Sequence, residues 1–275
     1  MTKPPSTAPD SLQDKYMVPA LERGLKLLLQ FSRAERRLSA PELARRLGLP
    51  RTTTFRLLNT LETMGFVRRD EASNLYQLDM AVLRLGFEYL ASLELTELGR
   101  PLLERLRDET GFSANLAIRD GRAIVFVAKA SAPTPFVSTV YVGTRLPAHA
   151  TLLGRVLLSD LTLEQLRALY PEDTLQSFSP RTPRTVNEMH AIAQADHERG
   201  YAIDKGFFES DVGSAAAPVR DHTGQMVAAI GVTIPMIEFE ATPQAEEAVV
   251  AKVRRAADEL SRLLDYAPHT VHHSA

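Results

Sequence analysis

The chain has 275 residues, a formal net charge of −2 at pH 7 and no cysteine. Its length is sufficient for two domains with separate hydrophobic cores, and the lack of cysteine excludes a disulfide scaffold and a thiolate metal site. No apolar run reaches the ~18–20 residues that a membrane span requires. Residues 1–16 lack the apolar core of a signal peptide and are rich in Pro, Ser and Thr. We expect a cytoplasmic protein without membrane contact, with a disordered lead-in over residues 1–16.

Charge is distributed unevenly along the chain. Residues 1–78 carry 13 Lys and Arg against 8 Asp and Glu, a net charge of +5, whereas residues 79–275 carry 19 against 26, a net charge of −7. A basic N-terminal module favours a polyanionic partner, and the acidic remainder favours a different role. Chance clustering of charge on solvated surfaces is the simpler alternative.

Three helices are expected in residues 17–64. Leucines recur at helical spacing within "VPALERGLKLLLQF". A second helix begins after Ser39, which stands three residues before Glu42 in a capping-box pattern, and it ends at Gly48, a residue type that readily adopts the left-handed conformation. Pro50 then presets the first turn of a third helix. The inward-facing residues of this third helix are expected to be Leu57, Leu58, Leu61 and Met64.

The outward side of the third helix carries hydroxyls and guanidinium groups instead of the Glu–Lys pairs of an ordinary surface helix. Arg can bind guanine through two hydrogen bonds, Thr can contact a thymine methyl group or a phosphate, and a helix N-terminus favours an anion. Two helices joined by a Gly-Leu-Pro turn therefore predict a helix-turn-helix that binds double-stranded operator DNA. The predicted DNA contacts here are Ser39, Arg51, Thr52, Thr53, Thr54 and Arg56.

A β-hairpin is expected over residues 66–78, "FVRRDEASNLYQL". Its two strands flank a turn at residues 70–74, and the basic pair Arg68 and Arg69 ends the first strand. A basic wing lies across the DNA backbone and adds affinity more than sequence choice. Solvated arginines beside an acidic turn are the alternative. We predict DNA contacts from both arginines and a winged helix-turn-helix domain over residues 17–78.

The remaining chain predicts a mixed α/β domain over residues 99–266. Helix starts are expected at the capping residues Thr162, Thr185 and Thr242, and residues 267–275 are expected to be a disordered tail. A sheet that carries small residues and is covered by helices leaves room for a small-molecule pocket. Strands are expected at residues 112–119, 123–130, 136–142, 213–220 and 225–234.

No catalytic motif stands out in this larger domain. Its histidines are dispersed, and none has the spacing of a zinc-binding helix. The segment "GTRLPAHATLLG" lacks the Gly-Lys-Ser/Thr of a phosphate loop, and Ser214 lies outside a Gly-x-Ser-x-Gly pattern. We expect no enzyme, no cofactor and no metal site, although a dispersed catalytic site is left open.

Several segments, in order along the chain, resemble the IclR family of bacterial transcriptional regulators. They are "ALERGLKLL", "LSAPELARRLGLPRTTTFRLLNTLETMGFVRRD", "YQLDMAVLRLG", "LPAHATLLGRVLL", "ERGYAID" and "AAAPVRDHTGQMVAAIGVTIP". The resemblance implies an α+β fold with an N-terminal winged helix-turn-helix, a linker helix over residues 79–98 and a C-terminal GAF-like effector-binding domain. "RLPAHATLLGRVLL" most resembles the subgroup that controls aromatic catabolism through the β-ketoadipate pathway.

The resemblance also implies where an effector binds. Family members hold an effector carboxylate against backbone amides at the start of the helix that follows "PAHA", which suits an anion at a helix N-terminus. The polar residues of the family pocket correspond to four further positions. Each of those has a simpler alternative role in a turn or at a strand end. The predicted effector-binding residues are Leu152, Leu153, Asp204, Ser214, Gly231 and Thr233.

The sequence departs from the family pattern at two of these places. Gly231 stands where serine is common. In "DKGFFESD", Gly206 and Phe207 replace a usual acidic pair, and Asp211 occupies a usual glycine position. We therefore expect a pocket that is less polar and more aromatic than a site for a small oxoacid.

Together these features predict a ligand-responsive, sequence-specific transcriptional regulator. Its effector is expected to be a small aromatic or dicarboxylic acid, and the resemblance implies self-association to a dimer or a tetramer. The alternative is an architectural protein that binds DNA irrespective of sequence and whose second domain only oligomerises. The ratio of specific to non-specific DNA affinity separates the two.

Overall fold

The computed structural model describes residues 16–32, 34–91, 94–133, 140–172, 174–236 and 243–267. The chain divides into two compact units, Met1–Ser92 and Leu93–Ala275. The predicted lead-in and tail lie almost entirely outside the described residues. Within those residues, no helix is long and apolar enough to cross a membrane.

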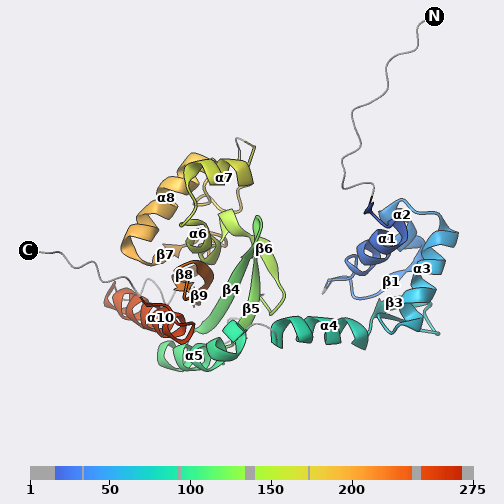
Figure 1. The fold of residues 1–275 in the computed structure, drawn as a ribbon, viewed down its shortest axis with the longest axis horizontal. Coiled ribbons are helices and arrows are strands. Elements are labelled where there is room, and N and C mark those ends of the chain that lie inside the picture. The colour runs from blue at the N-terminus through green and yellow to red at the C-terminus, as the bar shows by residue number, and fades with distance from the viewer. Residues whose placement is uncertain are drawn as a thin grey trace, which may run out of the picture. The chain divides into compact units, whose positions relative to one another are not determined.

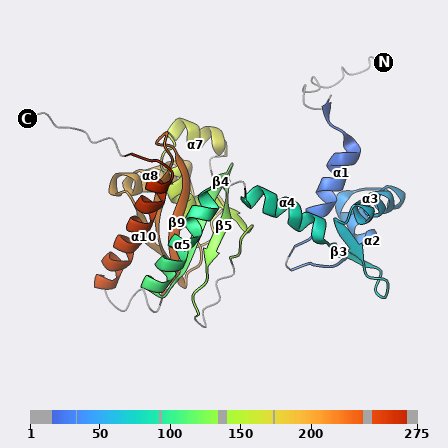
Figure 2. The same ribbon diagram turned by 60° about the horizontal axis from the view of Figure 1, so that its bottom comes forward.

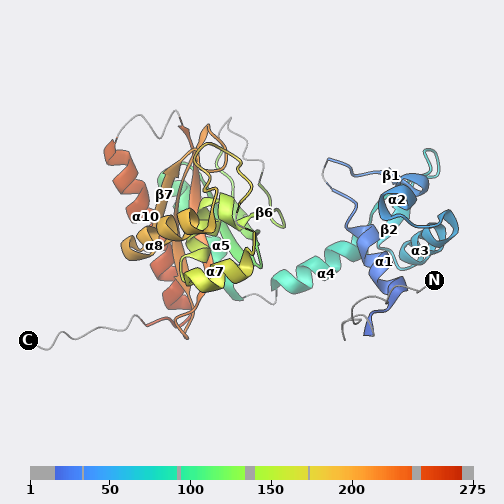
Figure 3. The ribbon, with the colours of Figure 1, turned by 90° about the horizontal axis from the view of Figure 1, so that it is seen from above.

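The first unit is a helix-turn-helix domain with a three-stranded antiparallel wing (Figure 3). In the wing β3 is central and pairs with β1 on one side and β2 on the other. Its elements are α1 (Pro19–Leu28), β1 (Leu38–Ser39), α2 (Ala40–Leu47), α3 (Arg51–Thr63), β2 (Val67–Arg69), β3 (Leu75–Leu78) and α4 (Met80–Ala91).

The turn between α2 and α3 forms as its sequence predicts. The Ser39 hydroxyl accepts a hydrogen bond from the Glu42 N–H at 3.3 Å, and Gly48 ends α2 with φ of 62°. The return half of the predicted capping box does not form, because the Glu42 carboxylate accepts hydrogen bonds from Arg45 and Arg46 instead. Helix α2 is therefore capped by serine, and its glutamate joins a surface ion cluster.

The core of this unit contains Leu27, Leu43, Leu58, Val67 and Tyr76. One predicted core residue of α3 is wrong, because Met64 is 60% exposed. Met64 is the C-cap residue, beyond the last helical turn. Thr54, one turn before Leu58, is buried on the inward face in its place.

The second unit is built on a six-stranded antiparallel sheet in the order β6-β5-β4-β9-β8-β7. The strands predicted around β4, β5, β8 and β9 all form, whereas most of the strand predicted at 136–142 lies outside the described residues. Two strands, β6 and β7, were not predicted, because each is too short to show an alternating pattern. The strands are β4 (Ser113–Asp120), β5 (Ala123–Ala130), β6 (Arg145–Pro147), β7 (Ala202–Lys205), β8 (Val212–Arg220) and β9 (Met226–Pro235).

Helices cover both faces of this sheet (Figures 1 and 2). Helices α5 and α10 pack side by side on one face, and α6 packs on the other, with α7 and α8 beside it. The segment predicted as a linker helix over 79–98 corresponds to α4 and the first residues of α5. The helices are α5 (Glu94–Thr110), η2 (Ala148–Ala150), α6 (Leu152–Leu158), α7 (Leu163–Leu169), α8 (Val186–Arg199) and α10 (Pro243–Leu263).

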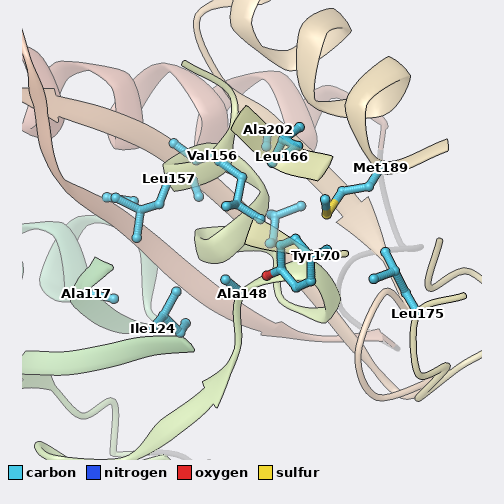
Figure 4. Packing of buried hydrophobic residues seen from close by; sticks show 14 of the residues in the cluster. Ala117, Ile124, Ala148, Val156, Leu157, Leu166, Tyr170, Leu175, Met189 and Ala202 are labelled. Carbon is cyan, nitrogen blue, oxygen red and sulfur yellow. The ribbon is translucent and has the colours of Figure 1, made fainter. Parts of the chain in front are cut away.

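Small side chains bring α6 close to the sheet. Ala117 and Ala202 lie on the strands under α6, and Val156 and Tyr170 complete the packing above them (Figure 4). Gly154 is needed at the start of α6, because a Cβ there would lie 2.1 Å from the Ala148 carbonyl oxygen. The first turn of α6 is thereby fixed over the middle of the sheet.

Glu42 makes the stability of the first unit depend on pH. Hydrogen bonds from Arg45 and then Arg46 lower the pKa of Glu42 from 4.5 to about 2. A depressed carboxyl pKa contributes stability that is fully present above about pH 4.5 and is lost as pH falls toward 2.

We expect Glu42→Gln to lower the melting temperature at pH 7, and we expect this difference from the wild-type protein to shrink below pH 4.5, as measured by thermal denaturation. Glu71→Gln is the matched control, because Glu71 makes no ion pair with a described residue. A melting-temperature difference that stays constant from pH 7 to pH 3 would contradict the assignment.

Candidate DNA interface and effector cavity

The N-terminal half of α3 presents cationic and hydroxyl groups to solvent. Arg51, Thr52 and Arg56 are exposed, and Thr53 is half-buried. Neither arginine forms an ion pair with any residue that the structure describes. By contrast, Arg46 on α2 is neutralised by two glutamates. The guanidinium groups of α3 are therefore available to a polyanion.

Two of the predicted DNA contacts have other roles in the fold. Thr54 has no exposed surface, and its hydroxyl donates a hydrogen bond to the Pro50 carbonyl oxygen at 3.3 Å. Its side chain is thus unavailable to DNA, because the helical period places it one turn before the buried Leu58. Ser39 is half-buried and caps α2, although its hydroxyl proton remains available to an acceptor.

Phe55 on α3 was not among the residues predicted from the sequence to contact DNA, and its side chain is 55% exposed. Its ring lines a shallow groove together with Arg51, Thr52 and Arg56. An exposed aromatic ring beside two free guanidinium groups is an apolar surface of the kind that contacts thymine methyl groups. In the sequence, Phe55 could have been recognised as an apolar residue that does not share the helical face of the buried leucines.

The wing holds its two arginines differently. Arg68 is exposed and forms no ion pair within the described part of the chain. Arg69 donates a hydrogen bond to the Asn74 side chain and lies 6.0 Å from the centre of the Tyr76 ring. Asn74 adopts a φ of 57°, which closes the turn. Arg69 is therefore oriented by the wing itself, and Arg68 is free to approach a phosphate.

A cavity of about 440 Å³ lies between α6 and the sheet of the second unit. This size falls within the usual range for small-molecule sites. All six predicted effector-binding residues line it, although they come from four separate elements. They are Leu152 and Leu153 on α6, Asp204 on β7, Ser214 on β8, and Gly231 and Thr233 on β9.

The start of α6 offers backbone donors to this cavity. The Thr151 hydroxyl caps the helix by accepting a hydrogen bond from the Gly154 N–H at 3.3 Å. The preceding amides, of Leu152 and Leu153, belong to the first turn, where N–H groups have no intrahelical acceptor. Both residues line the cavity.

The cavity wall is rich in aromatic rings and poor in cations. Phe126, Phe207 and Phe208 line it, and none of its lining residues within the described chain is Lys or Arg. Phe207 packs against the Arg155 guanidinium, 4.7 Å from the ring centre. Two residues that depart from the family pattern, Phe207 and Asp211, thus lie in the cavity wall.

Behind this wall a buried ion network connects α6, α8 and β7. Arg155 is 2% exposed and lies 2.5 Å from the Asp196 carboxylate and 2.8 Å from Asp204. Asp204 also contacts Arg181 at 3.1 Å, and Asp196 contacts Arg199. Three guanidinium groups face two carboxylates, so the network carries a net charge of +1. The Asp204 carboxylate is therefore occupied by two arginines rather than free for a ligand.

A buried asparagine on the central part of the sheet also lines the cavity. Asn115 on β4 is 2% exposed, and its Nδ2 donates a hydrogen bond to the Thr233 hydroxyl at 3.1 Å. Its Oδ1 has no hydrogen-bond partner among the residues that the structure describes.

Comparison with known proteins decides which family this arrangement belongs to. Residues 87–262 match the family described as "Bacterial transcriptional regulator IclR C-terminal", and residues 20–71 match "IclR helix-turn-helix domain". The chain belongs to the IclR family. It is an IclR-type transcriptional regulator with a DNA-binding helix-turn-helix and an α+β fold.

Named relatives of this IclR-family chain are regulators as well. It is 27% identical over 254 residues to the HTH-type transcriptional regulator XynR of Escherichia coli, covering 91% of this chain and 98% of XynR. It is 30% identical over 221 residues to the Pca regulon regulatory protein of Pseudomonas putida, covering 80% and 75%. A solved transcriptional regulator from Rhodococcus sp. RHA1 superimposes with a TM-score of 0.80 at 32% identity, covering 90% and 99%. Neither matched family is an enzyme family.

Sequence reasoning missed two residues of the IclR-type cavity region. Arg155 stands alone in the apolar helix "LLGRVLL", and Asn115 stands alone in the apolar strand "SANLAI". An isolated polar residue in a buried element is a usable signal, because such groups are buried only when they have a partner or a ligand. The partners themselves come from distant segments, which the sequence pattern does not connect.

We expect Arg155→Met to destabilise the second unit by about 3–5 kcal/mol, because it removes the buried cation that Asp196 and the half-buried Asp204 share. The measurement is the free energy of unfolding from urea denaturation. Arg145→Met is the matched control, since Arg145 pairs with Asp120 on the surface, where the loss is below about 1 kcal/mol. Equal losses in the two variants would show that the buried network contributes no more than a surface pair.

Proposed function

We propose that this chain is a ligand-responsive regulator that binds its operator in a sequence-specific manner. The observation that supports this most is that one chain has both unpaired guanidinium groups on α3 and, in its second unit, a cavity lined by all six predicted effector-binding residues. Base edges are read by the exposed residues of α3, and the wing and the start of α2 hold the phosphate backbone. The proposed base-reading residues are Arg51, Thr52, Thr53, Phe55 and Arg56, and the proposed backbone contacts are Ser39, Arg68 and Arg69.

The proposed effector is a small organic acid whose carboxylate accepts hydrogen bonds from the amides of Leu152 and Leu153. The aromatic lining favours a ring as the body of the molecule. A dicarboxylic acid is the less favoured member of the predicted class. The cavity wall contains Glu209 and Asp211 in addition to the paired Asp204 and lacks Lys and Arg among its described residues, so a second carboxylate near Glu209 or Asp211 meets like charge.

We also propose that the protein self-associates through the first unit. Helices α1 and α4 each carry large apolar side chains on the surface, which is unusual for a surface that stays in water. These exposed residues are Leu21, Leu25, Met80, Leu83 and Leu85. A dimer presents two α3 helices to two half-sites of a pseudo-palindromic operator.

In this mechanism, effector binding favours one arrangement of the linked subunits and so changes the half-site spacing that the dimer can span. A coupling free energy of about 1–3 kcal/mol, or roughly 5- to 150-fold in affinity, is sufficient for a switch. Because binding free energies are reciprocal, operator DNA changes effector affinity by the same factor.

We expect Arg51→Ala to reduce operator affinity by about 1–3 kcal/mol and to relax the preference at one base position. Arg68→Ala is the matched comparison, since it removes a wing arginine that is also unpaired. It should weaken binding to all sequences alike and reduce the slope of log affinity against log salt. Fluorescence anisotropy with a set of single-base operator variants measures both effects. If Arg51→Ala keeps the full base preference, base reading lies elsewhere on α3.

The proposed function is tested by titrating the full chain onto its upstream intergenic DNA and onto a scrambled duplex at two salt concentrations. Aromatic and dicarboxylic acids are added in turn. We expect a specific-to-non-specific ratio of about 10³ or more and a shift with at least one acid. Calorimetry of that acid with and without DNA should return the same coupling factor. Equal, salt-sensitive binding to both duplexes, with no response to any acid, would favour an architectural DNA-binding protein.

A further inference from the structure

The unpartnered amide oxygen of Asn115 is the clearest unfilled hydrogen-bonding group in the described cavity. The side chain is 2% exposed and lines the cavity between α6 and the sheet. Its Nδ2 is used by Thr233, whereas Oδ1 has no partner in the described part of the chain. Buried polar side-chain atoms usually have a hydrogen-bond partner, and the exceptions need an explanation.

The sheet register explains why no neighbouring side chain supplies that partner. Gly231 lies directly opposite Asn115 on β9, and Ala216 lies opposite Gly231 on β8. Directly opposed residues point to the same face of a sheet, so β9 offers Asn115 no polar side chain. On the other side, Lys129 on β5 lies opposite Asn115, but its ammonium group donates a hydrogen bond to the Val140 carbonyl oxygen at 2.6 Å. A Cβ at Gly231 would lie 2.6 Å from the Ala215 carbonyl oxygen, so the backbone itself excludes a serine hydroxyl here. The partner that fits Oδ1 is therefore a molecule within the cavity.

The remaining wall of the cavity adds carboxylate acceptors to the hydroxyl groups of Thr144, Thr151, Ser214 and Thr233, which can donate or accept. Both carboxylate oxygens of Asp204 already accept hydrogen bonds from protein groups, and Glu209 and Asp211 are exposed lining residues. Backbone donors come from the start of α6, which in the proposed function receives the effector carboxylate. Hydroxyl groups of the wall can match a donor or an acceptor, whereas Oδ1 of Asn115 and the carboxylates can only accept, so a hydrogen-bond donor on the ligand is the group that suits them.

We propose that Asn115 is a specificity-determining residue that accepts a hydrogen bond from a hydroxyl or amino group of the effector. The effector class is accordingly an aromatic monocarboxylic acid that carries one such donor on its ring. This assignment rests on the proposed function, because it takes the cavity to be the effector site. Acids of the same shape that lack a donor leave Oδ1 unpaired and bind more weakly.

The test is isothermal titration calorimetry on the full chain with a matched set of acids. The set contains benzoate, 3- and 4-hydroxybenzoate, 3- and 4-aminobenzoate, and 3- and 4-methoxybenzoate. The methoxy group has nearly the reach of the hydroxyl but can only accept hydrogen bonds. We expect at least one hydroxy or amino acid to bind about 10-fold more tightly than benzoate and than its methoxy counterpart.

Variants at Asn115 assign that preference to one atom. In Asn115→Leu, the new side chain has a similar volume and no polar atom. The affinity of this variant for each of the seven acids should lie within about twofold of the wild-type affinity for benzoate. Asn115→Asp retains acceptor oxygens and should retain the preference for a donor while binding every acid more weakly. Asn187→Leu is the matched control, because it makes the same substitution at an exposed asparagine on α8 outside the cavity lining, and it should leave all seven affinities unchanged.

The outcomes separate this inference from the proposed function. Binding of benzoate without a preference for a donor, or a preference that survives in Asn115→Leu, overturns the role of Asn115 and leaves the effector site standing. Tighter binding of a methoxy acid overturns it too, because Oδ1 cannot accept from a methoxy group. If the wild-type protein binds its operator but none of the acids, both the effector site and this inference fail. Should Asn115→Leu not fold, the hydroxy and methoxy affinities of the wild-type protein still decide.

Discussion

The buried contact between Arg155 and its two aspartates is the interaction on which the second unit depends. It joins three elements that are distant in the chain: α6 supplies the cation, α8 supplies Asp196 and β7 supplies Asp204. A guanidinium group that is 2% exposed is stable only with its full set of acceptors. The network therefore ties α6 to β7, the edge strand of the sheet, and residues of both elements line the cavity.

The floor of the cavity follows from a second constraint, the small residues of β8 and β9. Alanine and glycine along these strands permit α6 to approach the sheet, and Gly154 permits η2 to pack on α6. At Gly231 the strands are too close for any side chain. Gly231 lies opposite Asn115 on β9 and offers it no side chain, and Oδ1 of Asn115 has no partner among the described residues.

Local sequence signals were sufficient for most elements of the fold. Gly48 and the caps at Ser39, Thr162 and Thr185 form as expected, because each depends only on residues within a few positions. The failures share a different cause. Met64 was expected in the core, and β6 and β7 were not predicted, since helix ends and short strands are decided by tertiary contacts. The positions of the effector residues came from family resemblance, whereas the network around Arg155 required the three-dimensional structure.

Arginine has different roles in the two units, and the partners decide which. On α3 and the wing, Arg51, Arg56 and Arg68 lack acidic neighbours among the described residues, so their charge acts on the surroundings of the protein. In the second unit, Arg155 is enclosed with two carboxylates, and its charge acts on the fold. The net charge of a sequence segment indicates only the first of these roles, the charge that acts on the surroundings. Arg45 and Arg46 on α2 are paired with glutamates, so their positive charge is largely cancelled nearby. The net charge of residues 1–78 therefore does not show that unpaired arginines lie on α3 and the wing.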